Sequence, residues 1–77
     1  MMKIGMLWYD DTLKRLATEK VARAAAYYAE KYGARPNTCH VHPSVLDGMQ
    51  ALEPSGMHLI SDRGIQVNHF WVGVSEE

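Results

Sequence analysis

The feature that most constrains the fold is one amphipathic stripe in a chain of only 77 residues. Between residues 12 and 32, apolar side chains recur at spacings of three and four, the period of a helix face: Leu13, Leu16, Ala17, Val21, Ala24, Ala25, Tyr28 and Tyr32. We therefore predict a helix from Thr12 to Tyr32, with Asp10 and Asp11 supplying N-cap chemistry. Gly33 stands where a C′ glycine ends a helix. This one helix takes more than a quarter of the chain.

Short segments on either side of the helix show the period-two pattern of strands. We expect the first strand, residues 3–9, to lie in the centre of a sheet, because both of its faces are largely apolar. A second strand covers residues 37–42 and ends at Pro43. A short helical turn from Pro43 to about Gln50 and a turn at 53–56 follow it.

The last third of the sequence predicts a hairpin. Its strands are residues 57–61 and 65–74, joined by a turn at 62–64, and the second strand breaks at Asn68 and His69. The order is β-α-β-short α-β-β. We thus expect one α+β domain, residues 1–77, with a long helix on a mainly antiparallel sheet of about four strands. One helix covers one face of such a sheet, so the other face must meet water or another subunit.

Composition narrows the class of protein. The chain is 47% hydrophobic and 22% charged, which is typical of a globular domain, and one cysteine excludes an intramolecular disulfide. No apolar run approaches a membrane span, and the first residues do not resemble a signal peptide, so we expect a cytoplasmic protein without a membrane partner. A net charge of −1 gives no reason to expect a nucleic-acid partner.

Four histidines suggest a metal site. His40 and His42 are two apart on a strand and share a face, opposite Cys39 and Val41. His58 or His69 could add a third ligand, which would suit zinc or another divalent metal. The alternative interpretation is that these histidines only occupy the solvent face of the sheet, and we predict no resident cofactor. For Cys39 we expect a buried structural thiol rather than a nucleophile.

An alternative metal site is formed by Asp10 and Asp11, at the end of the first strand, although helix capping also explains both. A first strand that runs into Tyr9 and Asp10 and then a helix resembles the opening of the small CRISPR-associated endoribonuclease family. The resemblance covers about the first fifth of the chain. It implies a dimeric, ferredoxin-like fold with a metal at Asp10. Residues 36–43 and the His-Phe-Trp segment at 69–71 depart from that family.

The aromatic residues point to an interface. Phe70 and Trp71 are consecutive in a strand and must face opposite ways, so one of them lies away from the helix. With Trp8, these residues are the predicted contact surface of a homodimer, formed through the outer sheet face or an open edge strand, and another protein partner is possible. We therefore expect a non-catalytic, self-associating interaction module. The alternative is a metal-dependent hydrolase or nuclease that uses His40 and His42, or Asp10.

Overall fold

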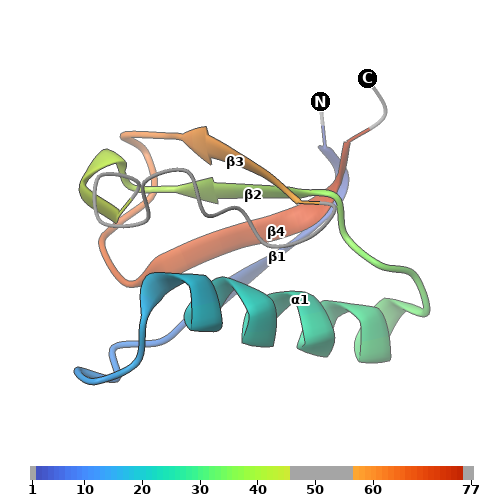
Figure 1. The fold of residues 1–77 in the computed structure, drawn as a ribbon. Coiled ribbons are helices and arrows are strands. Elements are labelled where there is room, and N and C mark those ends of the chain that lie inside the picture. Colours follow the sequence, from blue (N-terminus) through green and yellow to red (C-terminus); the bar gives the residue numbers. More distant parts are fainter. Residues whose placement is uncertain (1, 46–56, 76–77) are drawn as a thin grey trace.

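A computed structural model of the chain describes residues 2–45 and 57–75, and it shows one helix lying against a four-stranded sheet (Figure 1). The predicted α+β class is confirmed. The turn after Pro43 begins as predicted, with residues 43–45 helical, while its remainder and the predicted turn at 53–56 lie outside the described residues. The elements are β1 (Met2–Tyr9), α1 (Ala17–Tyr32), β2 (Thr38–Val41), β3 (His58–Ser61) and β4 (His69–Ser75).

The sheet is mixed, with strand order β1-β4-β2-β3. β4 pairs antiparallel with both β1 and β2, whereas β2 and β3 are parallel. The predicted hairpin is therefore wrong, because the connection at 62–68 carries the chain past β2 instead of turning straight back. The predicted central position of β1 is also wrong, since β1 forms an edge.

Burial explains why β4 occupies the centre and β3 the edge. Phe70, Val72 and Gly73 of β4 are buried, whereas three of the four residues of β3 are exposed. A strand with few apolar side chains gives up the least stabilisation from apolar burial when it lies at an edge of the sheet. β4 starts at His69, directly after Asn68, whose φ of 69° breaks the extended backbone as the sequence predicts.

The helix begins five residues later than predicted. Leu16 is its N-cap residue and makes no side-chain capping bond. The Asp10 carboxylate does not cap the helix, because it accepts hydrogen bonds from the Thr12 N–H at 3.0 Å and the Arg15 guanidinium at 2.8 Å. The helix ends as predicted at Gly33, which has a φ of 73° and donates its N–H to the Ala29 carbonyl.

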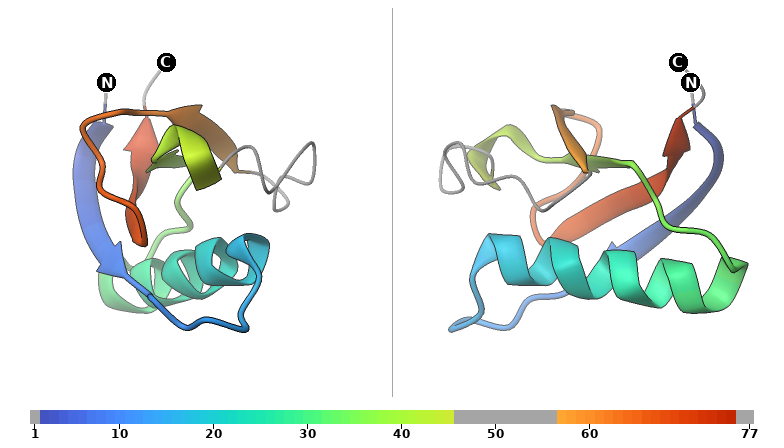
Figure 2. Two further views of the ribbon diagram at one scale, coloured as in Figure 1. Left: turned by 90° about the vertical axis from the view of Figure 1, so that its left-hand side faces the viewer. Right: turned by 45° about the vertical axis from the view of Figure 1, so that its right-hand side comes forward.

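The core lies between α1 and one face of the sheet, as both views in Figure 2 show. Its buried members come from the helix, from the three strands β1, β2 and β4, and from the residue before β3: Met6, Val21, Ala24, Tyr28, Cys39, Val41, Met57, Phe70 and Val72. Cys39 and Val41 face the core, as predicted. No helix separates β3 from β4, so the ferredoxin-like order β-α-β-β-α-β is absent from this part of the chain.

Candidate functional site

His40 lies on the helix-free face of the sheet, beside the turn that follows β3. Its Nδ1 is 3.0 Å from the Asp62 carboxylate, whose other oxygen accepts the Gly64 N–H at 2.8 Å. The Gly64 N–H and the His40 ring together hold the pKa of Asp62 below its usual range. The pair joins β2 to the end of β3 and leaves the far ring nitrogen of His40 outside this contact.

The other three histidines have local partners or are exposed. The Nδ1 of His42 accepts the Ser44 N–H at 3.1 Å, and His69 Nδ1 lies 3.1 Å from the Val67 carbonyl oxygen. The His69 ring also packs on Tyr9, with centroids 4.8 Å apart. His58 is exposed and pairs with Thr38, two register positions from the pair of His40 and Ile60.

The predicted metal sites gain no support from this placement. In residues 2–45 and 57–75, no group of three His, Cys, Asp or Glu side chains could hold a metal ion. Asp10 is 7% exposed and already engages Thr12 and Arg15; burial alone would raise its pKa, but these hydrogen bonds prevail and hold it well below its usual range. Asp11 accepts the hydroxyl of Tyr9 at 2.9 Å, which raises the Tyr9 pKa.

Cys39 is enclosed by the core, as the sequence predicts. Its side chain is 0% exposed, and burial raises the pKa of its thiol to about 12. A thiol that is protonated and sealed from solvent cannot act as a nucleophile at neutral pH.

Apolar and aromatic side chains gather on the helix-free face. Strand pairing places Leu7, Tyr9, Trp71 and Ile60 on this face, since paired residues point the same way. Leu7 is 54% exposed, Tyr9 57% and Ile60 41%. Trp71 is partly buried because its indole lies against Gly5, where an added Cβ would come within 2.4 Å of the ring. We call these four residues the open face.

The three predicted interface aromatics thus lie in three different places. Trp71 lies on the open face, while Phe70 is 1% exposed and belongs to the core. Trp8 is partly buried on the helix side of β1, where its ring packs on Tyr27 at a centroid distance of 4.9 Å. Its indole N–H is buried and has no hydrogen-bond acceptor in the described residues.

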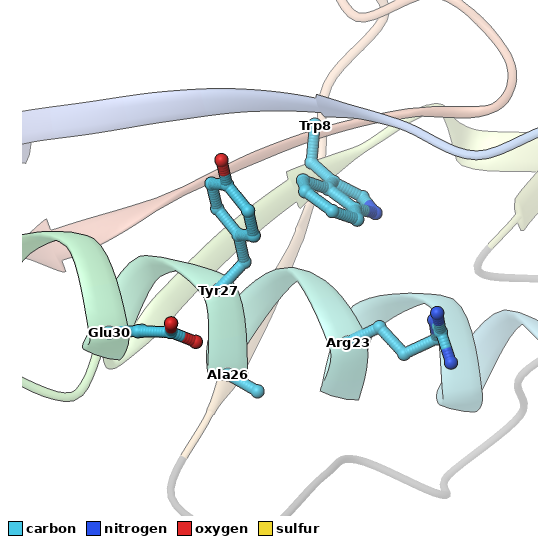
Figure 3. Close-up of a pocket in the computed structure, with 5 residues that line it drawn as sticks. All are labelled: Trp8, Arg23, Ala26, Tyr27 and Glu30. Atoms are coloured by element: carbon cyan, nitrogen blue, oxygen red, sulfur yellow. The ribbon is translucent and has the colours of Figure 1, made fainter.

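A groove of about 280 Å³ runs between β1 and α1 (Figure 3). Trp8 and Tyr27 form its wall, and Arg23, Ala26 and Glu30 line it from the helix. The four helix residues, Arg23, Ala26, Tyr27 and Glu30, recur at i, i+3, i+4 and i+7, so they form a second stripe beside the core stripe. The sequence prediction missed this groove; the spacing of Arg23 and Glu30 around Tyr27 was the available signal.

Comparison with known proteins yields no relative. No family model, curated protein or solved structure matches the chain. Within the described ranges, no helix is both long enough and apolar enough to cross a membrane.

Proposed function

We propose that this chain is a non-catalytic, cytoplasmic interaction module that self-associates, and that a second copy covers its open face. The observation that carries the proposal is the exposure of Leu7, Tyr9 and Ile60 around Trp71 on a sheet face that α1 leaves uncovered. Leu7, Tyr9 and Trp71 are neighbours across β1 and β4, and His40 lies between Trp71 and Ile60. Exposed apolar patches of this kind mark contact sites.

The chemistry of the open face favours a second copy as its occupant. Its four residues carry no charge, and His40, which lies between Trp71 and Ile60 on the same face, contacts the Asp62 carboxylate, while Asp11 accepts the hydroxyl of Tyr9. Two such faces can therefore approach without repulsion between like charges. Sheets that pack face to face lie about 10 Å apart, a spacing that interdigitated side chains such as Leu7 and Ile60 fill.

The size of the face sets the expected strength of this contact. Strands about 4.8 Å apart that rise about 3.3 Å per residue give the face an area of roughly 400 Å² in each copy. Stable interfaces bury about 1,200–2,000 Å² in total, so two open faces alone make a weak contact. We expect a dissociation constant in the micromolar range.

Matched leucine substitutions test the proposal. Leu7→Asp places a carboxylate in the open face, whereas Leu13→Asp makes the same change at a loop position that is 98% exposed and outside it. In sedimentation velocity from 5 to 500 µM, we expect wild type and Leu13→Asp to associate and Leu7→Asp to associate at least tenfold more weakly. A monomeric wild type throughout this range, or equal behaviour of both variants, would contradict the proposal.

A further inference from the structure

Among the described residues, the free edge of β1 is a second surface without a partner, after the open face. β1 pairs only with β4, so the backbone groups along its other side have no strand beside them in the described sheet. Natural edge strands are protected by being short or by carrying lysines, prolines or bulges. The edge strand β3 is four residues long. β1 has eight residues, and its one charged residue, Lys3, coincides with a register shift near the strand start. In the part of the chain that the structure describes, residues 4–9 therefore form an unprotected edge.

The groove beside this edge has a charge pattern that complements itself. Arg23 and Glu30 are exposed, and neither has an ion-pair partner within residues 2–45 and 57–75. They lie seven residues apart on one stripe of α1, with Ala26 and Tyr27 between them. In an isologous contact, residue i meets j and j meets i. Two antiparallel copies of this stripe, centred between Ala26 and Tyr27, therefore place each Arg23 opposite the Glu30 of the other copy.

We propose that β1 pairs antiparallel with β1 of a second copy, and that Arg23 and Glu30 of the two α1 helices form two reciprocal ion pairs across the two-fold axis. The axis stands perpendicular to the sheet and runs beside Trp8, which contacts Tyr27 at the middle of the groove. In this register Trp8 opposes Trp8 of the second copy and Leu7 opposes Tyr9, so the strands pair over residues 7–9. The two sheets then continue as one sheet of eight strands. This contact adds a second surface to the proposed self-association and leaves the open face free.

The dimensions of the fold suit this arrangement. α1 lies closest to β4, one strand in from the edge. With strands about 4.8 Å apart, two such helices lie roughly 14 Å from one another across a β1–β1 junction. Since Cα atoms stand about 2.3 Å from a helix axis, facing Cα atoms are about 9 Å apart, a gap that an arginine and a glutamate side chain bridge together. The rings of Trp8 and Tyr27 from both copies fill the space between the helices.

Charge reversal with rescue tests the ion pairs. Arg23→Glu or Glu30→Arg turns both attractive pairs into repulsive ones, so we expect each variant to weaken this contact at least tenfold. The double variant Arg23→Glu/Glu30→Arg restores both pairs and should recover most of the wild-type affinity. Arg35→Glu is the matched control, because Arg35 is exposed, lies outside the groove and undergoes the same change of charge. Far-UV circular dichroism verifies that each variant is folded.

Variants that each disrupt one surface distinguish the open-face contact from the β1 contact. With both contacts present, we expect wild type to form species larger than a dimer at high concentration, Ile60→Asp and Arg23→Glu each to stop at a dimer, and the combined variant to remain a monomer. Ile60 serves here because it lies on the open face but on β3, outside the β1 edge. Amide hydrogen exchange adds a direct readout: protection of residues 7–9 should fall on dilution in Ile60→Asp and not in Ile60→Asp/Arg23→Glu. An Arg23→Glu variant that associates as tightly as Arg35→Glu, or a double variant without rescue, would overturn the β1 contact while leaving the open-face proposal standing.

Discussion

Replacing Gly5 by alanine should destabilise the protein through one side chain, the indole of Trp71. A Cβ at Gly5 would lie 2.4 Å from Trp71 Cζ2 and 2.5 Å from Cε2, so the ring must move by about 1 Å to reach ordinary contact distance. The backbone cannot supply this movement, because Gly5 pairs with Gly73 in the middle of the β1–β4 ladder. The indole must therefore rise from the sheet.

The expected size follows from two opposing effects. Overpacking of this kind costs about 1–3 kcal/mol, whereas alanine in a strand is about 0.5–1 kcal/mol better than glycine. We expect Gly5→Ala to lower the free energy of unfolding by about 1–2 kcal/mol. For a domain of this length that corresponds to a fall in Tm of roughly 4–16 °C.

Urea denaturation followed by circular dichroism measures this loss, at several protein concentrations so that association does not enter the value. The chain has two tryptophans, so a Trp8→Phe background makes Trp71 the only indole reporter, and its emission should shift to the red in Gly5→Ala. In a Trp71→Ala background the same glycine substitution should be neutral or stabilising. A Gly5→Ala protein as stable as wild type, or an equal loss in the Trp71→Ala background, would refute the reasoning.

Three further predictions concern individual side chains. The pKa of Asp10 is lower in the folded than in the unfolded protein, so its carboxylate stabilises the fold fully above about pH 5 and progressively less as the pH falls. Asp10→Asn should therefore flatten the decline in the free energy of unfolding, measured with urea, between about pH 5 and 2. An unchanged decline would contradict this. The Cys39 thiol, buried with a pKa raised to about 12, should react with a disulfide reagent at pH 8 only as fast as the protein unfolds, whereas immediate stoichiometric labelling would show it accessible. Gly33→Ala, at a φ of 73°, should cost about 1 kcal/mol in thermal melts; no loss would mean that the helix end relaxes freely.

Local chemistry explains which parts of the fold could be predicted. The helix end depends on Gly33 and its neighbours alone, and the alternation of Cys39 and Val41 with two histidines identifies the buried side of β2 without knowledge of its partners. The predicted helix start is too early because the Asp10 carboxylate accepts its hydrogen bonds from Thr12 and Arg15, which lie in the turn before α1 and not in the helix. In the sequence, an aspartate that caps a helix looks the same as an aspartate that holds a turn before the helix.

The strand order and the groove depend on distant residues. A period-two pattern is the same in a hairpin and in a crossover, so nothing near Asp62 indicates that β4 passes β2 and enters between β1 and β2. The position of Trp71 could be inferred from its alternation with Phe70. The groove could not, because the spacing of Arg23 and Glu30 indicates only that they share one flank of α1, and not that this flank lies beside the free edge of β1.

The position of β4 also determines how the chain can assemble. β4 is the last strand in the sequence, yet it joins β1 to β2, and each of its pairs with β1 links residues sixty or more positions apart, from Tyr9 with His69 to Met2 with Ser75. Such distant pairing carries the full entropy of loop closure and makes folding slow. While the chain is being synthesised, β1 has no strand of this sheet to pair with until residues 69–75 have left the ribosome. During that interval, its unprotected edge is available to any other nascent chain.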